Sequence, residues 1–301
     1  MNIIDDFMAS DFVDDPDNAD LSINEGTEIT EDAAEILSAF EGDLWGSDHT
    51  GRGRTGALEG LTKLSDAAAE ALSKYEGNLY LGSLTELSDA AAESLAKHKG
   101  ELNLDCLQEL SDAAAESLSK HMGGLYLQHL FGFRSQVRKL SDDAAESFSK
   151  HKGGLYLSGL TELSDAAAES LSKSQGHLTL GLSEISDTAA ESLSKHKGKC
   201  RVGLEDDRLT KSRLTLFPLR KLSDAAAESL SKHDGCLDLG GLTELSDAAA
   251  ESLAKHKGWL ILRNLNRDNP NLSDAALESL SKKEGRISGQ DPKKWVESLR
   301  Q

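Results

Sequence analysis

The residue that first suggests chemistry is histidine, because it recurs at one position of a repeated phrase, three residues after a leucine. Six copies have it: His98, His121, His151, His196, His233 and His256. A column of imidazoles could bind a metal or respond to pH. Other copies hold a different residue there: Phe40, Tyr75, Ser174 and Lys283. Because no second ligand type accompanies the position, we expect a structural role for these rings and no metal or other cofactor.

A second repeated position varies from copy to copy and is expected to face outward on a short strand. In chain order it holds Trp45, Tyr80, Asn103, Tyr126, Tyr156, Thr179, Arg201, Asp238 and Ile261, with Trp259, Gln128 and Arg263 alongside. Tyrosine and tryptophan concentrate at binding surfaces, since they offer rigid contact area with a polar tip. They also favour strands intrinsically, so a purely structural explanation stays open. Nearly copied helices beside varied strands indicate a scaffold that presents a binding surface.

Arginines form the third candidate set, and they gather in four expansions of the repeat near residues 46–57, 131–139, 204–221 and 266–271. The residues are Arg52, Arg54, Arg134, Arg138, Arg208, Arg213, Arg220 and Arg267. Arginine offers a planar fork for carboxylates and phosphates. We expect all four expansions to lie between a strand and a helix, and so to emerge on one edge. The alternative is that exposed loops simply collect polar residues.

Catalytic patterns have little support. The chain shows no Ser-His-Asp arrangement, no phosphate-binding glycine loop and no CxxC pair, and helix capping explains the repeated serines and aspartates. We therefore expect a protein that is not an enzyme.

The element that positions these residues is the phrase LSDAAAESLAKHKG at Leu87–Gly100, which recurs with a period of about 23 residues. In the copy from Leu64, Ser65 is a good N-cap and Asp66 suits the positive end of the helix. The alanines favour helix strongly, and Gly77 is expected to end it as a left-handed cap after about three turns.

Each helix has one apolar face, and each following strand alternates. Leu64, Ala68, Ala69 and Leu72 fall on one side of the helix. In the strand, Leu79 and Leu81 are expected to point inward and Tyr80 outward. One short strand and one short helix cannot bury a core alone, so the repeats must stack.

The sequence Leu87-Ser88-Asp89-Ala90-Ala91-Ala92-Glu93-Ser94-Leu95 after an L-x-L strand resembles the leucine-rich repeat family. It is most similar to a bacterial-type subclass, cysteine-containing-like, whose helices open I-T-D-x-G-L-x-x-L. The resemblance covers residues 21–290 and implies an α/β solenoid shaped as a horseshoe or arc. Short parallel strands would line its concave face and helices its convex face. The family's Asn or Cys after the strand is replaced by Leu84, Leu107, Leu160 and Leu242, so no asparagine ladder is expected.

The ends of the chain depart from the repeat. Residues 1–20 are expected to form an acidic amphipathic cap or, alternatively, a partner-binding segment. The first strand is expected at Leu21-Ser22-Ile23, the repeat array at 21–285, and a capping helix with Trp295 and Leu299 inward at 286–301. Pro218 argues against a regular central strand through 204–221, which could be a degenerate repeat or a hairpin.

Composition limits the class of protein. The net charge is −19, but residues 1–51 hold fifteen Asp and Glu without Lys or Arg, so the rest is nearly balanced. Three cysteines in an odd, non-metal pattern suit a reducing compartment. With no signal peptide or membrane span apparent, we expect a cytoplasmic monomer.

These observations predict a protein- or peptide-recognition scaffold. The expected binding residues are Trp45, Tyr80, Asn103, Tyr126, Tyr156, Arg201, Asp238, Trp259, Arg52, Arg54, Arg134, Arg138, Arg208 and Arg213. The alternative is a polyanion or nucleic-acid binder that uses the loop arginines. The acidic composition argues against nucleic acid.

Overall fold

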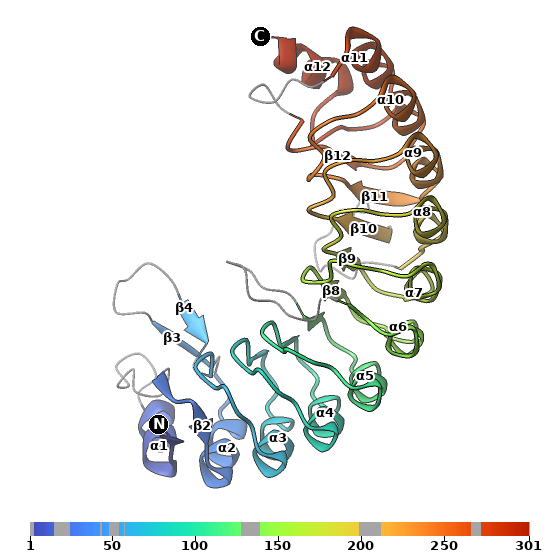
Figure 1. Cartoon of the computed structure of the whole chain (residues 1–301). Helices are drawn as coiled ribbons and strands as arrows, with labels where there is room; N and C mark the ends of the chain where they lie inside the picture. The colour runs from blue at the N-terminus through green and yellow to red at the C-terminus, as the bar shows by residue number, and fades with distance from the viewer. Residues whose placement is uncertain are drawn as a thin grey trace. The chain divides into compact units, whose positions relative to one another are not determined.

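A computed structural model describes residues 3–14, 25–42, 44–47, 54–56, 58–127, 139–198, 212–265 and 272–300, with 45–47 and 54–56 by backbone alone. The chain forms two compact units. Unit 1 contains Met1–Val137 and His151–Gly159, and unit 2 contains Arg138–Lys150 and Leu160–Gln301. In both units short strands alternate with short helices along the chain (Figure 1).

Unit 1 contains three groups of strands. Its elements are β1 (Ile3–Ile4), α1 (Asp6–Asp14), β2 (Glu28–Ile29), α2 (Glu31–Ser38), β3 (Trp45–Ser47), β4 (Arg54–Gly56), α3 (Asp66–Leu72), β5 (Leu79–Tyr80), α4 (Asp89–Leu95), β6 (Leu102–Asn103), α5 (Asp112–Leu118), β7 (Leu125–Tyr126) and β8 (Leu155–Leu157). Strands β1 and β2 pair in parallel, whereas β3 and β4 form an antiparallel pair. Strands β5 to β8 pair in sequence order, all parallel, with their leucines in register.

Unit 2 continues the alternation. Its elements are α6 (Asp142–Phe148), α7 (Asp165–Leu171), β9 (Leu178–Leu180), α8 (Asp187–Ser194), β10 (Ser212–Leu216), α9 (Asp224–Ser231), β11 (Gly235–Asp238), α10 (Asp247–Ala254), β12 (Leu260–Ile261), α11 (Asp274–Ser281) and α12 (Pro292–Arg300). Strands β9 to β12 are parallel and in sequence order, with Leu178, Leu214, Leu237 and Leu260 in register. The α/β repeat expected from the sequence is therefore present in both units.

The repeat helices begin as expected but are shorter. The Ser65 hydroxyl accepts a hydrogen bond from the Ala68 N–H at 3.1 Å, and Ala68 and Leu72 are fully buried. The helix spans seven residues, two turns instead of three. After Leu72 the chain tightens, and the Tyr75 N–H donates to the Leu72 carbonyl at 3.1 Å. This tightening replaces the third turn of α-helix.

The Ser-Asp dipeptide at each helix start also links neighbouring helices. The Ser111 hydroxyl donates to the Asp89 carboxylate of the preceding repeat at 2.5 Å, and Ser164 donates to Asp142 in the same way. The same bond joins five further pairs: Ser88–Asp66, Ser186–Asp165, Ser223–Asp187, Ser246–Asp224 and Ser273–Asp247. One dipeptide thus caps its own helix and supplies the acceptor for the next.

Gly77 and several equivalent glycines have a different role from the one expected, whereas Gly285, after α11, has the left-handed φ of +88° that fits a cap. Within the described residues, glycines with positive φ are Gly235, Gly285 and Gly289, so Gly77 is not a left-handed cap. A Cβ on Gly77 would lie 2.3 Å from the hydroxyl of Tyr75, whereas later glycines are in close contact with the backbone of the preceding loop. A Cβ on Gly123 would lie 2.0 Å from the carbonyl oxygen of Gly100. No side chain fits between backbones this close.

The segment 204–221 contains a strand of the sheet. Strand β10 pairs with β9 and β11, and its Leu214 and Leu216 are fully buried, as is Leu219 beyond it. The degenerate-repeat interpretation is correct, because S-R-L-T-L-F-P-L repeats the spacing of G-N-L-Y-L-G-S-L. The expectation that 204–221 as a whole lies between strand and helix was wrong, as was the argument from Pro218. That proline lies beyond the last residue of β10.

Two helices outside the regular repeat lie at the ends of the described chain. Helix α1 packs against α2 and buries Ala9 and Phe12, while Phe7 is exposed. Helix α12 packs against α11 and buries Trp295 and Val296, with Leu299 half-buried. The first strand expected at 21–23 lies outside the described residues. Within the described part of the chain, no helix has the length and apolarity needed to span a membrane.

Candidate binding surfaces on the strands

The outward side chains of β5 to β8 form a surface that we call the tyrosine face: Tyr80, Asn103, Tyr126 and Tyr156. They share one register position, between leucines that are buried, and each is half-buried. This is the alternation expected from the sequence.

Tyr126 and Tyr156 are stacked, with ring centroids 4.2 Å apart and planes 2° from parallel. The glycine two residues before each tyrosine makes room for its ring. A Cβ on Gly154 would lie 2.9 Å from Cε2 of Tyr156, and one on Gly124 would lie 3.1 Å from Cε2 of Tyr126. Burial, followed by the nearby Tyr156 and Glu101, raises the pKa of Tyr126 well above its usual value. The pair is therefore a neutral, flat aromatic platform.

Asn103 continues this surface in a fixed orientation. Its amide nitrogen donates to Oδ2 of Asp105 at 2.9 Å, and its amide oxygen accepts from the Asp105 N–H at 3.1 Å. Glu101 and Asp105 flank strand β6, which carries Asn103. The tyrosine face is consequently aromatic with an acidic character.

The corresponding surface of unit 2 is charged in the opposite sense, and we call it the arginine face: Arg213, Thr215, Asp238, Trp259 and Arg263. The buried carboxylate of Asp238 lies at its centre. Oδ2 of Asp238 is 3.1 Å from Nη2 of Arg213 and 3.4 Å from Nη2 of Arg263. Oδ1 accepts a hydrogen bond from the Gly240 N–H at 3.0 Å. One fixed carboxylate therefore orients two guanidinium groups.

A neutral hydrogen-bonded group borders the arginines on β9 and β10. Nε2 of His177 lies 3.2 Å from Oγ1 of Thr179 and 3.4 Å from Oγ1 of Thr215. Burial, followed by the positive charge of Arg213, lowers the pKa of His177 to about 4. His177 is uncharged at neutral pH, so the charges on this side of the face come from arginine.

The repeated histidines form what we call the histidine column, divided between the units. In unit 1 the rings of Tyr75, His98, His121 and His151 stack at centroid distances of 6.1–6.4 Å. In unit 2, His196, His233 and His256 stack at 6.3 and 6.4 Å. All six histidines are at most 2% exposed. Burial is the main cause that lowers the pKa of each, to about 4 for His121 and His233.

The column position faces backbone carbonyls of the preceding repeat. Nδ1 and Nε2 of His196 lie 3.3 and 3.1 Å from the carbonyl oxygens of Ser172 and Gly176. Residues other than histidine at this position also bond to backbone carbonyls. In unit 1 the Tyr75 hydroxyl donates to the Gly42 carbonyl at 2.7 Å, and in unit 2 the Lys283 ammonium donates to the Gly258 carbonyl at 2.9 Å. Among the described residues no cluster of His, Cys, Asp and Glu could hold a metal ion. The geometry indicates a structural column.

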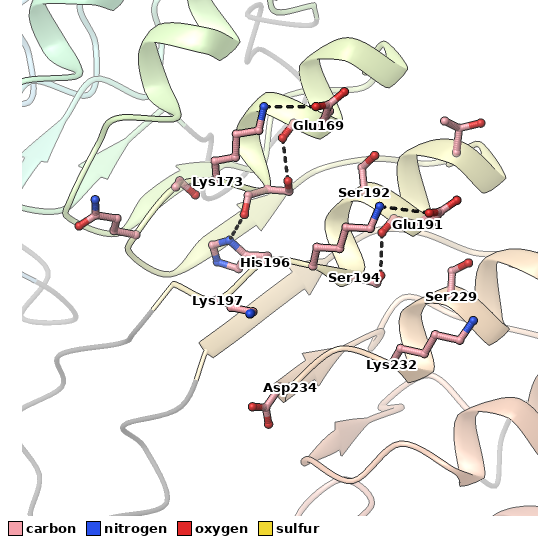
Figure 2. A pocket seen from close by; sticks show the side chains of 15 residues that line it. Glu169, Lys173, Glu191, Ser192, Ser194, His196, Lys197, Ser229, Lys232 and Asp234 are labelled. Carbon is pink, nitrogen blue, oxygen red and sulfur yellow. Dashed lines mark hydrogen bonds and ion pairs between the residues drawn. The ribbon is translucent and has the colours of Figure 1, made fainter.

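An open groove of about 1560 Å³ lies at the ends of helices α7 to α9 in unit 2 (Figure 2). Its charged walls are largely paired within the helices. Lys173 lies 3.3 Å from Glu169, and Lys195 lies 3.1 Å from Glu191. These exposed i,i+4 pairs are typical of a solvated helix surface. The strand faces are therefore the stronger candidates for binding.

The predicted binding residues divide into three groups. Tyr80, Asn103, Tyr126 and Tyr156 lie together on the tyrosine face, and Arg213, Asp238 and Trp259 lie on the arginine face. Arg213 is on strand β10 and not in a loop. The remaining positions lie outside the described residues: Arg52, Arg134, Arg138, Arg201 and Arg208, and the side chains of Trp45 and Arg54.

Sequence reasoning missed Thr215 in the arginine face and His177 at its border. The signal for Thr215 was the second copy of the strand spacing within 212–219. A glycine pair before L-Y-L, at Gly123-Gly124 and Gly153-Gly154, was the available signal for the stacked tyrosines.

Comparison with known proteins gives no relative: no family model matches the chain, and no curated protein matches it in sequence.

Proposed function

We propose that the protein is a leucine-rich-repeat-like solenoid that recognises a protein or peptide, without catalysis, through its outward strand side chains. One observation carries this proposal. The buried positions of the repeats hardly vary, whereas the strand positions that face outward carry a stacked tyrosine pair in unit 1 and two arginines around one carboxylate in unit 2. Packing requires the first kind of position and leaves the second open to selection for binding.

The stacked tyrosines have the properties of an interface anchor. Two parallel rings present a rigid surface, which loses little side-chain entropy when a partner covers it. Glycines at 124 and 154 give the rings their space, so the pair is organised before any ligand arrives. A preorganised aromatic surface favours binding, because less ordering is required on association.

Two further aspects of the proposal concern the setting of the protein. The three cysteines, Cys106, Cys200 and Cys236, are an odd number without metal-type spacing, which supports a reducing compartment such as the cytoplasm. Each repeat has a short strand, in which leucines at alternate positions are buried, followed by a short helix. This arrangement supports the leucine-rich-repeat type of solenoid.

The test is cross-linking and affinity capture from the source cell with three forms of the whole chain. The wild type and Lys120→Ala, a change on the helix surface, should capture the same protein partner. Tyr126→Ala combined with Tyr156→Ala should lose it, by more than about 1–2 kcal/mol in the purified complex. Equal capture by all three forms would contradict recognition through the tyrosine face.

A polyanion is the second candidate ligand, because arginines outnumber carboxylates on the arginine face. If nucleic acid binds there, affinity should fall steeply with salt, by several log units of the binding constant over a few-fold rise in concentration. We expect no appreciable binding of random oligonucleotides at physiological salt. Tight, salt-sensitive retention that is independent of Tyr126 would favour the polyanion.

A further inference from the structure

We propose that the arginine face is a carboxylate-recognition site, which takes a peptide segment of the partner carrying Glu or Asp next to an apolar residue. The inference rests on the proposed function and names the chemistry of the partner. It is argued from unit 2 alone.

The register of the strands gives the charge of this surface. The outward residues on and beside β10 to β12 include Arg213, Asp238 and Arg263. Ile287 pairs with Leu260 as an isolated parallel bridge, which places Arg286 in register with Trp259. These described positions hold three positive charges and one negative charge. The tyrosine face, in contrast, has Glu101 and Asp105 beside its strand β6, so an acidic ligand is favoured on the arginine face.

The cations are held in place before a ligand arrives. Asp238 is 2% exposed and is fixed by the Gly240 N–H, so its position varies little. A Cβ on Gly240 would lie 3.0 Å from Oδ1 of Asp238, so glycine at this position leaves room for the carboxylate. The guanidinium of Arg263 remains accessible, since its side chain is 65% exposed. Because Asp238 already orients the two guanidinium groups, less conformational entropy is lost when they bind the carboxylate of a ligand.

The Asp238 carboxylate does not pair every donor of Arg213. Each guanidinium carries five N–H donors in a planar fork that matches a carboxylate. Nε of Arg213 is buried and has no hydrogen-bond partner in the described structure, which is a costly arrangement for a donor. If a ligand carboxylate accepts some of the hydrogen bonds that Arg213 now donates to Asp238, the guanidinium of Arg213 can rotate so that its Nε–H also finds an acceptor. The site thus gains from a second acidic group.

The neighbouring side chains define the rest of the ligand. Trp259 and Ile261 are half-buried on and beside β12, in register with Cys236 and Asp238. Because Trp259 and Ile261 are apolar and Arg263 follows two residues later, an apolar residue beside the acid has a surface to cover. Aromatic and arginine side chains are the types that most often dominate protein interfaces.

The experiment measures binding of two fluorescein-labelled octapeptide pools by fluorescence anisotropy, one of Leu and Glu and the other of Leu and Gln. At about 50 mM salt, where screening is weak, the glutamate pool should bind at least about tenfold more tightly than the glutamine pool. Arg213→Gln with Arg263→Gln should weaken binding of the glutamate pool about tenfold or more. Arg263→Gln alone, at an exposed side chain that does not threaten the fold, should weaken it in the same direction.

Lys232→Gln is the matched control, because it removes one positive charge from helix α9, where Lys232 pairs with Glu228. It should leave binding unchanged. Equal weakening by Lys232→Gln, equal binding of the two pools, or tighter binding of single-stranded dT20 than of the glutamate pool would each overturn the inference. Such a result together with intact partner capture would leave recognition by the tyrosine face standing, so the two proposals fail separately.

Discussion

Acidification should destabilise the protein through the histidine column. His121 and His233 are fully or almost fully buried, and their pKa is lowered from 6.5 to about 4. His121 faces the rings of His98 and His151, and the column of His233 continues to His196 and His256. Besides burial, the like charge on a neighbouring ring disfavours each proton. The unfolded chain has neither restraint and binds these protons more tightly.

The sign follows from linkage. A folded pKa below the unfolded pKa makes stability complete above pH 6.5 and lowers it as the pH falls from there toward 4. At about 1.36 kcal/mol per pKa unit, a shift from 6.5 to about 4 costs about 3.4 kcal/mol per ring once the pH is below 4. At pH 5 the loss is already about 1.8 kcal/mol per ring relative to pH 7.

The assay is urea unfolding followed by circular dichroism at pH 7 and pH 5, a range in which ordinary carboxylates stay largely ionised. His121→Tyr supplies the comparison, since Tyr75 already occupies the column position in another repeat. The variant should lose about 1.8 kcal/mol less than the wild type between the two pH values. Adding His233→Tyr in unit 2 should reduce the loss of unfolding free energy between pH 7 and pH 5 by a similar further amount, because the effects of distant substitutions on stability are additive. An identical pH dependence in wild type and variants would refute the reasoning.

Further predictions concern packing, capping and metals. Gly123→Ala, whose Cβ would meet a backbone carbonyl at 2.0 Å, should cost well over about 1 kcal/mol of unfolding free energy, whereas Gly82→Ala, whose Cβ would meet the amide oxygen of Asn103 at 3.1 Å, should cost less. Ser111→Ala removes a helix cap and a bond to the preceding helix, and should cost about 1–2 kcal/mol in urea unfolding. Leu118→Ala should cost about 2–5 kcal/mol and exposed Lys120→Ala under about 0.5 kcal/mol, and equal losses would contradict the assigned helix faces. Thermal stability should be unchanged by zinc or nickel, and a metal-dependent rise in melting temperature would contradict a purely structural column.

The alternation of strand and helix was predictable, because it depends on short-range patterns. Ser65 as a cap, Ala68 and Leu72 as core, and Leu79 and Leu81 as the inner strand positions all follow from spacing within one repeat. Local periodicity contains this information directly.

Contacts between repeats were not predictable from one repeat. Gly77 looked like a left-handed cap because that is the commonest local reason for glycine at the end of a helix. At Gly77 a Cβ would instead lie 2.3 Å from the hydroxyl of Tyr75, and at Gly100 and Gly123 it would meet the carbonyl of the preceding loop, a contact that exists only after stacking. The hydroxyl-carboxylate bond between Ser111 and Asp89 likewise joins residues 22 positions apart.

Strand β10 at Ser212–Leu216 was missed for a different reason. Two stretches fit the strand spacing, one beginning at Gly198 and one at Ser212. The first has the expected glycine and was preferred, although the second has the leucines that are buried. A strand is selected by how well its side chains fill the core, and a single glycine is weaker evidence than three leucines.

The Ser-Asp dipeptide makes the repeats interchangeable. In the seven pairs given above, the serine of one repeat donates to the aspartate of the repeat before it, so the two sides of such a repeat are complementary to other copies. A DNA duplication or deletion of one whole period would therefore create a new junction with the same bonds as the old ones. An array built this way can change its length during evolution without inventing new contacts, while the outward strand residues of each added copy are free to diverge.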